Sequence, residues 1–479
     1  MKHITAFLIS IVTATVSLLG QDLKKLAVSD NKRFLVHDDG SPFFYLADTA
    51  WELFHRLNKN QTHTYLSNRA GKGFNVVQCV LLSEINGLTE PNANGDVPLI
   101  DLDPTRPNEK YFQHVDEVVN MATSMGIYMA ILPTWGSWVE DKFHYLFPAH
   151  QIFTEENARK YGKFLGSRYK NKNGIIWVVG GDRSSGNYNN IWDAMARGLR
   201  EGDEGNHLIT FHPSGQHSSS TLWQNASWLD FNLVQSGHAS RFVNSYDFIT
   251  HDYNLEPTKP VLDGETNYED IPINFHLSNG RFVDYDVRVS SYFSVFAGGF
   301  GITYGCNNIW QMYQGDRAII NARSTWDESL DLPGAFQMRF LKQLMESRPF
   351  LNRIPDQSIL LERNSTLVPH SDKGQLHMQA TRDGTKAGRD ATYLMVYMAI
   401  GQSVKLNSGV IPAKRLMLWW YDPRTGSAIP VGEQENTGIV ETSWSTMPWH
   451  NGAGPDWVLV VDDASRNYPP PGQRIEQRQ

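Results

Sequence analysis

The sequence predicts an α/β protein that consists of a (β/α)8 TIM barrel followed by a C-terminal all-β sandwich. Eight short apolar runs alternate with helical stretches over roughly 310 residues, which is the pattern of a barrel. The runs are nearly continuous in apolar residues, as is typical of strands buried on both faces. After residue 350 the alternation stops, and strand-like runs follow one another with turn signals alone between them.

The predicted barrel strands are bounded by Gly, Pro or polar turn residues. In chain order they are Phe43–Asp48, Phe74–Leu82, Ile127–Trp135, Ile175–Asp182, Leu208–Gly215, Phe231–His238, Pro260–Thr266 and Gly301–Asn307. Two of the predicted helices between them are Glu155–Tyr169, with Thr154 as its N-cap, and Tyr285–Ala297. A doubly wound sheet is the alternative. It usually carries a Gly-rich phosphate loop after its first strand, where this chain has DTAWELF.

The C-terminal part predicts a sandwich of seven or eight strands. Its strand-like runs are SILLER, LHMQA, TYLMVYMA, QSVKL, RLMLWWYD, GIVETSW and DWVLVVDD. We expect the sandwich to brace the barrel rather than to bind glycan, because LMLWWYD alternates as a core strand does. The predicted organisation is a signal peptide (1–20), a barrel (21–350), a sandwich (351–465) and a flexible tail (466–479) that contains three consecutive prolines.

The N-terminus has the pattern of a secretory signal peptide. Lys2 and His3 precede an apolar run from Ile4 to about Leu19, and Gly20 offers a small-residue boundary. An uncleaved anchor is the alternative. No later run approaches the roughly 18 apolar residues of a membrane span, so we expect no stable membrane insertion after signal cleavage. The sequence thus predicts an exported protein, periplasmic or extracellular.

Composition narrows the class of partner. A net charge of −8 without a basic block argues against nucleic acid. Both cysteines, Cys79 and Cys306, lie in apolar runs, which favours buried free thiols over a disulfide. The chain has no HExxH metal motif, no GxSxG nucleophile motif and no phosphate-binding loop. The simplest prediction is a hydrolase without a metal or another cofactor, and the aromatic share of 12% suits a carbohydrate partner.

The ends of two predicted strands carry the best candidates for catalysis, because barrel enzymes place their reactive groups there. The fourth strand ends in GGDR with Asp182, and the seventh ends in DGETNYE with Glu265. These strands lie on opposite sides of a barrel mouth, so the two carboxyl groups can face each other across a sugar. Glycoside hydrolysis commonly uses such a pair. We predict Asp182 as acid/base and Glu265 as nucleophile; the alternative is a structural role, such as pairing with Arg183.

Other strand ends supply candidate substrate-binding residues: Asp48, Trp51, Trp135, His212, His238 and Trp310, with Glu84 as a further neighbour. Among these, Trp135 and Trp310 are candidates for a sugar-stacking platform, although filling of the core fits each equally well. The two histidines are candidates to bind sugar hydroxyls or to hold the nucleophile, and a structural role is the alternative. Asp48 is the preferred substrate-binding carboxylate by position. Asp263 is either an alternative nucleophile or a buried, hydrogen-bonded carboxylate.

The strings LADTAWELF, IIWVVGGD, PVLDGETNYE and YGCNNIWQMY resemble the apiosidase-like hydrolases of glycoside hydrolase family 140. The run WWYDPRTG resembles the C-terminal module of that family, which is described as a "putative collagen-binding domain of a collagenase". The resemblance implies retaining hydrolysis of an apiose linkage in pectin, on the side chains of rhamnogalacturonan-II. It also implies an Asp after strand four and a Glu after strand seven as the catalytic pair, which match Asp182 and Glu265.

The predicted mechanism is a double displacement, for which the two carboxyl groups should lie about 5–5.5 Å apart. Burial and the charge of Glu265 should keep Asp182 protonated near neutral pH. Two alternatives remain open from the sequence. One is the same barrel acting on another plant or host glycan, and the other is a non-catalytic carbohydrate-binding protein.

Overall fold

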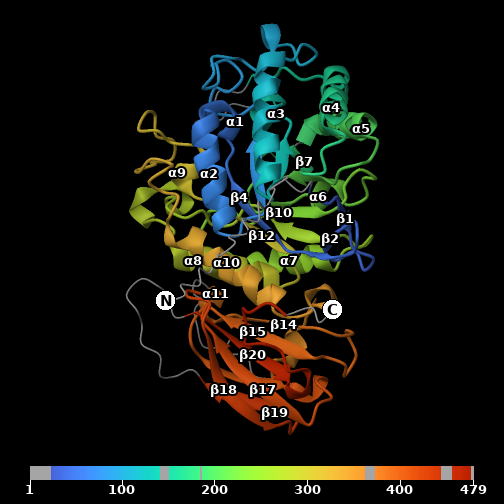
Figure 1. Ribbon diagram of the computed structural model, residues 1–479, viewed down its shortest axis with the longest axis vertical. Helices are drawn as coiled ribbons and strands as arrows, with labels where there is room; N and C mark the ends of the chain where they lie inside the picture. Colours follow the sequence, from blue (N-terminus) through green and yellow to red (C-terminus); the bar gives the residue numbers. More distant parts are fainter. Residues whose placement is uncertain (1–22, 141–149, 184–185, 362–372, 444–455, 476–479) are drawn as a thin grey trace, which may run out of the picture.

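A computed structural model describes residues 23–140, 150–183, 186–361, 373–443 and 456–475. The predicted signal peptide lies outside these residues. Figure 1 shows a helix-covered barrel at one end of the molecule and a β-sheet module at the other. Within the described ranges, no helix has both the length and the apolar character needed to span a membrane.

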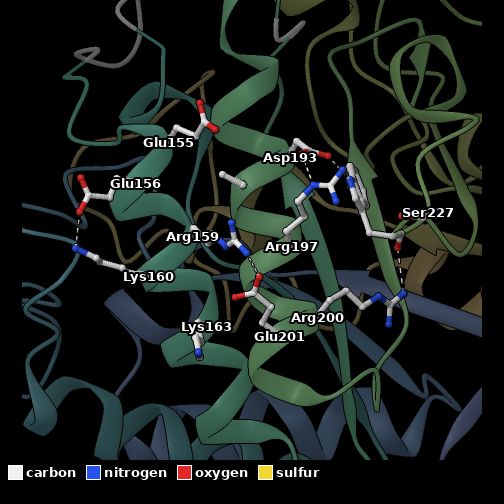
Figure 2. A pocket seen from close by; sticks show the side chains of 12 residues that line it. Glu155, Glu156, Arg159, Lys160, Lys163, Asp193, Arg197, Arg200, Glu201 and Ser227 are labelled. Carbon is white, nitrogen blue, oxygen red and sulfur yellow. Dashed lines mark hydrogen bonds and ion pairs between the residues drawn. The ribbon is translucent and has the colours of Figure 1, made fainter.

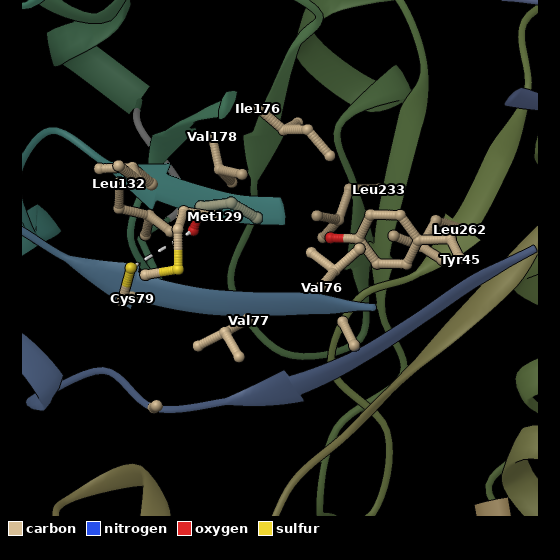
Figure 3. Packing of buried hydrophobic residues seen from close by; sticks show 14 of the residues in the cluster. Tyr45, Val76, Val77, Cys79, Met129, Leu132, Ile176, Val178, Leu233 and Leu262 are labelled. Carbon is tan, nitrogen blue, oxygen red and sulfur yellow. Dashed lines mark hydrogen bonds between the residues drawn. The ribbon is translucent and has the colours of Figure 1, made fainter. Parts of the chain in front are cut away.

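The barrel strands confirm the predicted fold class. They are β4 (Tyr45–Thr49), β5 (Val76–Val80), β6 (Tyr128–Leu132), β7 (Ile175–Gly180), β8 (Ile209–His212), β10 (Asn232–Gln235), β11 (Val261–Asp263) and β12 (Gly301–Tyr304). All eight coincide with predicted runs. β12 pairs in parallel with β4, which returns the sheet to its first strand. Buried apolar residues from strands around the barrel, such as Val76 of β5, Met129 of β6 and Leu233 of β10, belong to one core (Figure 3).

The barrel is least regular between β8 and β10. No ladder joins these two strands in the described sheet, and β10 pairs instead with the short antiparallel strand β9 (His217–Ser218). Three hydrogen bonds join the two segments here: Asp230 N–H donates to Ile209 O at 2.9 Å, Ile209 N–H donates to Asp230 Oδ2 at 2.7 Å, and Thr210 Oγ1 donates to Phe231 O at 2.7 Å. The barrel is therefore closed here by individual bonds rather than by a strand ladder.

Helices surround the strands. They are α1 (Leu53–Arg56), α2 (Lys59–Gly71), α3 (Glu109–Ser124), α4 (Glu155–Tyr169), α5 (Asn189–Asp203), α6 (Ser220–Trp223), α7 (Ser245–Tyr253), α8 (Asp284–Phe296), α9 (Asn307–Trp310) and α10 (Pro333–Glu346). The prediction for α4 is confirmed with its cap, because Thr154 Oγ1 accepts a hydrogen bond from the Asn157 backbone at 3.3 Å. The prediction for α8 is also confirmed, within one residue at each end.

Four glycines let α4 and α5 approach unusually closely: Gly162 and Gly166 on α4, and Gly198 and Gly202 on α5. A Cβ added at Gly198 would lie 2.2 Å from the Arg159 carbonyl oxygen, and one added at Gly166 would lie 2.4 Å from Leu199 O. These distances are far inside van der Waals contact. At these four positions the two helix backbones therefore touch directly, without side chains between them.

The N-terminal sheet was not predicted. It consists of β1 (Leu26–Val28), β2 (Leu35–His37) and β3 (Pro42–Phe43) in antiparallel order. Strands of two or three residues separated by polar turns give too short an apolar pattern to be recognised.

The C-terminal module is a sandwich of two antiparallel sheets. The larger sheet contains β13 (Ile354–Pro355), β14 (Met378–Arg382), β15 (Tyr393–Met398), β20 (Trp457–Asp463), β17 (Arg415–Tyr421) and β18 (Ala428–Glu435). The smaller contains β16 (Ser403–Asn407) and β19 (Ile439–Ser443), and the short helix α11 (Lys373–Leu376) precedes β14. Six predicted runs form strands. SILLER instead begins with a 3-10 helix (Gln357–Ile359), and the unpredicted β18 is mostly exposed, so it lacks an apolar signal.

The larger sheet packs against the barrel through one of its faces. Tyr397 stacks on Tyr292 of α8, with ring centroids 4.8 Å apart. Arg288 of α8 makes a doubly hydrogen-bonded ion pair with Asp456, in which both bonds are 2.9 Å long and both side chains are fully buried. The opposite face forms a second core with β16 and β19. These contacts are those expected of a module that braces the barrel.

Two smaller expectations concern the cysteines and the tail. Cys79 and Cys306 are buried free thiols, as predicted.

The start of the predicted tail contacts the sandwich. Tyr468 forms a 2.8 Å hydrogen bond with Thr392 and lies under the Arg348 guanidinium. This part of the predicted flexible tail therefore packs on the sandwich.

Candidate active site

Asp182 follows β7 at the end of a sharp backbone turn. Gly180 and Gly181 have φ values of 98° and 137°, a region that favours glycine, and Asp182 itself has a φ of 56°. A Cβ at Gly180 would lie 2.4 Å from His212 O, so only a glycine fits against the neighbouring strand at this position. The turn leaves the Asp182 side chain 37% exposed, with Arg183 Nη1 3.8 Å from Oδ2.

Glu265 follows β11, and its side chain is 8% exposed. His238 Nε2 lies 3.0 Å from Oε1. The His238 ring accepts a hydrogen bond at Nδ1 from the Tyr268 backbone N–H at 3.4 Å, so its proton belongs on Nε2, from which it donates to Glu265. On the other oxygen, His212 Nε2 lies 3.0 Å from Oε2, at ion-pair distance but without hydrogen-bond geometry. Both predicted histidines thus hold the predicted nucleophile.

The two carboxyl groups have pKa values that move in opposite directions. Burial and the negative charge of Glu265 raise the pKa of Asp182, against the opposing charges of Arg183 and His212. Burial also acts to raise the pKa of Glu265, but the contacts from His212 and His238 outweigh it and lower that pKa to about 2. The two pKa values are therefore displaced in the directions that an acid and a nucleophile require.

Two further titratable residues approach this pair. Tyr268 is buried, with its ring centroid 4.5 Å from that of His238, and burial and the charge of Glu265 raise the pKa of its phenol. Glu84, after β5, is also buried; burial and the charges of Glu52, Asp182 and Glu265 raise the pKa of its carboxyl. Sequence reasoning missed Tyr268, although its place three residues after Glu265 was a usable signal.

Asp48 does not lie where a substrate-binding carboxylate is needed. It is fully buried, and its Oδ2 accepts hydrogen bonds from Tyr65 OH at 2.5 Å and from Arg69 Nε at 2.6 Å. Both partners belong to α2, so Asp48 faces the helix layer rather than the barrel mouth. The expectation that Asp48 binds substrate rested only on its place at the end of a strand. Side chains alternate between the two faces along β4, and that of Asp48 points to the helix side.

The candidate tryptophans Trp51, Trp135 and Trp310 are buried, with exposures of 4% or less. Trp51 and Trp135 lie 5.3 Å apart and both contact the His212 ring, at 5.3 and 6.0 Å. Trp310 donates through Nε1 to Asn307 Oδ1 at 3.2 Å. A stacking platform needs an exposed ring face, so Trp135 and Trp310 fit the core alternative. Trp51 and Trp135 instead fix the position of His212.

The structure resolves the alternatives for Asp263. Its carboxyl is fully buried and accepts hydrogen bonds from Ser294 Oγ of α8 at 2.8 Å and from the Ser236 backbone at 3.3 Å. Burial raises its pKa to about 6. Asp263 therefore points outward to α8 and is the buried, hydrogen-bonded carboxylate.

A hollow of about 1070 Å³ lies elsewhere, on the surface that α4 and α5 form with Ser227 and Trp228 (Figure 2). Its lining is charged, and neighbouring side chains form pairs, such as Lys160 with Glu156 at 2.6 Å and Arg159 with Glu201. None of its lining residues belongs to the Asp182–Glu265 site. Among the residues that the structure describes, no group of three or more His, Cys, Asp or Glu side chains is arranged to hold a metal ion.

A barrel with two carboxyl groups at its strand ends, one with a raised pKa and the other with a lowered pKa, has the fold and site of a glycoside hydrolase. Comparison with known proteins shows the family. The model "Apiosidase-like, catalytic domain" matches residues 29–352, so the chain belongs to the apiosidase-like family of glycoside hydrolases. Residues 354–462 match the model "Putative collagen-binding domain of a collagenase". The two matches meet close to the predicted boundary at residue 350.

Solved structures of glycoside hydrolases resemble the chain over most of its length. The chain is 34% identical to one described as "Glycoside hydrolase", over 93% of this chain and 98% of that one, with a TM-score of 0.82. It is 33% identical to a glycoside hydrolase family 5 protein from Bacteroides vulgatus, over 93% and 94% of the two chains, also with a TM-score of 0.82. No curated protein matches the chain. The protein is thus a glycosidase, and its substrate is a carbohydrate.

Proposed function

We propose that this enzyme hydrolyses an apiose-containing linkage in pectin, on rhamnogalacturonan-II side chains, with retention of anomeric configuration. Membership of the apiosidase-like family supports the sugar. The observation that carries the chemistry is the opposite displacement of two pKa values, with Asp182 raised and Glu265 lowered by its histidines.

The first step of the proposed reaction is attack by Glu265 on the anomeric carbon. The bond from that carbon to the leaving oxygen breaks, and Asp182 gives its proton to the oxygen. Loss of the Glu265 negative charge in the covalent intermediate then lowers the pKa of Asp182. In the second step the ionised Asp182 accepts a proton from water, the resulting nucleophile attacks the anomeric carbon, and Glu265 leaves as a carboxylate.

The two histidines prepare Glu265 for the first step. Each contacts a different oxygen at 3.0 Å, which fixes the orientation of the carboxylate and favours its ionised form at a buried position. Trp51 and Trp135 hold His212 from two sides. Trp51, Trp135 and the two histidines thus act through the position and charge of Glu265.

The experiment that tests the proposal measures sugar release from rhamnogalacturonan-II oligosaccharides by wild type, Asp182→Asn and Glu265→Gln. We expect wild type to release an apiose-containing fragment and both variants to lose that activity. Glu201→Gln is the matched control, because it changes a carboxylate that lines the hollow on the surface of α4 and α5, outside the site. NMR of the first product anomer formed should show retention.

Each outcome has a separate meaning. Inversion at the anomeric carbon would overturn the double displacement and leave hydrolysis by the same pair. Full activity in Glu265→Gln would overturn the assignment of the nucleophile. If wild type releases nothing from pectin but cleaves another plant glycan, the proposed substrate is wrong.

Export is part of the same proposal, since pectin is met outside the cell. It is supported by the basic and apolar pattern of residues 1–20. Cell fractionation with detection of the mature N-terminus should find the protein in the periplasm or the medium, and recovery of the full-length chain from the cytoplasm would contradict it.

A further inference from the structure

An exposed aromatic ring lies beside the residues that hold Glu265. Phe275, on the loop after β11, has 40% of its surface exposed. Its ring centroid is 5.9 Å from that of His238, with the two planes at 82°. His238 in turn bonds Glu265 at 3.0 Å. Phe275 therefore stands one side chain away from the proposed nucleophile, on the solvent side of His238.

The backbone holds Phe275 in an unfavourable conformation. Asn274 and Phe275 have φ values of 51° and 62°, the left-handed region that non-glycine residues seldom adopt. Two hydrogen bonds keep them there: Asn274 N donates to His238 O, and Phe275 N donates to Pro272 O, both at 2.8 Å. Such strain persists where the surrounding structure imposes it, often at ligand sites. The loop is thus fastened to the same histidine that positions Glu265.

Phe275 provides what the predicted stacking residues lack. Trp135 and Trp310 are buried against other protein groups, whereas Phe275 keeps ring surface open to solvent. Sugar-binding sites are typically built from aromatic surface with a few polar groups that set orientation. Because His238 lies between Phe275 and Glu265, the Phe275 ring is too far from Glu265 to contact the sugar under attack and is at a distance that suits the next sugar of an oligosaccharide.

We propose that Phe275 is the stacking platform for the sugar unit adjacent to the one attacked, and so a determinant of substrate length. The proposal rests on the function proposed above, because it takes Glu265 as the attacking group. It predicts that Phe275 contributes to binding of oligosaccharides and does not contribute to chemistry at the anomeric carbon.

The test first identifies the cleaved glycan, by screening wild type against pectin, xylan, mannan and arabinan oligosaccharides. Kinetics are then compared on that oligosaccharide and on the matching one-sugar glycosyl fluoride, which has no neighbouring sugar. For Phe275→Ala we expect KM for the oligosaccharide to rise about three- to tenfold, the range expected for loss of one aromatic contact, with kcat nearly unchanged. Hydrolysis of the fluoride should stay at the wild-type rate.

Three variants complete the design. Phe275→Trp should restore the oligosaccharide KM, whereas Phe275→Leu, apolar but without a flat ring, should not. Phe336→Ala is the matched control, because it removes a similarly exposed phenylalanine on α10 and should leave both substrates unaffected. Circular dichroism confirms that each variant is folded.

The outcomes separate this inference from the function on which it rests. Cleavage of a glycan other than pectin overturns the proposed substrate, and the Phe275 comparison then proceeds on that glycan. Wild-type KM in Phe275→Ala, or an equal loss on the fluoride, overturns the stacking role. If wild type cleaves no glycan in the screen, both proposals fall together.

Discussion

Replacing His238 by alanine should move the acidic limb of the pH profile. In the structure His238 Nε2 donates to Glu265 Oε1 at 3.0 Å, and the contacts from His238 and His212 lower the pKa of Glu265 to about 2. In the proposed reaction the ionised Glu265 carboxylate is the form that attacks, so activity should be lost as pH falls through this pKa. Without His238, burial is opposed by His212 alone, and the pKa of Glu265 rises.

The size of the shift follows from the bond that is lost. A hydrogen bond to a charged group contributes about 1.5–3 kcal/mol, and one pKa unit corresponds to about 1.4 kcal/mol. The acidic limb of kcat/KM should therefore move up by about 1–2 units, from near pH 2 to between about 3 and 4. The basic limb belongs to Asp182 and should move less.

The assay is kcat/KM on the cleaved oligosaccharide between about pH 2.5 and 9, a range in which wild type should keep its activity at the acidic end and His238→Ala should lose activity below about pH 4. His238→Gln keeps a side-chain N–H donor and should show a smaller shift. His207→Ala is the matched control, since it removes another buried histidine, 3.1 Å from Asp203 and outside the site. An unchanged acidic limb in folded His238→Ala, or movement of the basic limb alone, would refute the assignment of Glu265 as the ionised partner.

Three further predictions concern stability. Gly198→Ala places a Cβ 2.2 Å from a backbone oxygen of α4 and should lower the free energy of unfolding, measured by urea titration, by about 1–3 kcal/mol. Gly71→Ala is the control, because a Cβ there meets nothing within 4 Å and should leave the free energy of unfolding nearly unchanged. Arg288→Met leaves Asp456 buried without its partner and should cost about 3–5 kcal/mol, much of which a second change, Asp456→Leu, should recover. Burial raises the pKa of Glu269 to about 7. The folded state therefore keeps a proton that the unfolded state releases above about pH 4, and the stability of the fold decreases as pH rises from about 4 to about 7. The melting temperature of Glu269→Gln should therefore gain on that of wild type between about pH 5 and 8, and parallel profiles would contradict the raised pKa.

The barrel strands could be located from the sequence because each is buried on both faces and so keeps an uninterrupted apolar run. The strand ends that carry Asp182 and Glu265 followed from the same pattern, since barrel topology sends both to one face. β18 escaped prediction for the opposite physical reason. It is an edge strand exposed along most of its length, and hydrogen bonding to β17 rather than burial makes it a strand.

The direction in which a side chain points was decided by tertiary structure alone. Asp48 stands at a predicted strand end, yet it bonds to Tyr65 and Arg69 of the helix layer. Phe275 carries no sequence signal, and its position depends on a strained backbone that is fastened to His238.

By itself, the sequence determined the fold class, the apolar strand pattern and the two carboxylates at opposite strand ends, because these depend on local periodicity and known topology. Tertiary structure decided which neighbours surround each carboxyl. The charge state of a buried group depends on contacts between residues far apart in the chain: His212 and His238 reach Glu265 from 53 and 27 positions away in the printed sequence. No local pattern encodes such distances, and they set the opposite pKa shifts on which the proposed roles of acid and nucleophile rest.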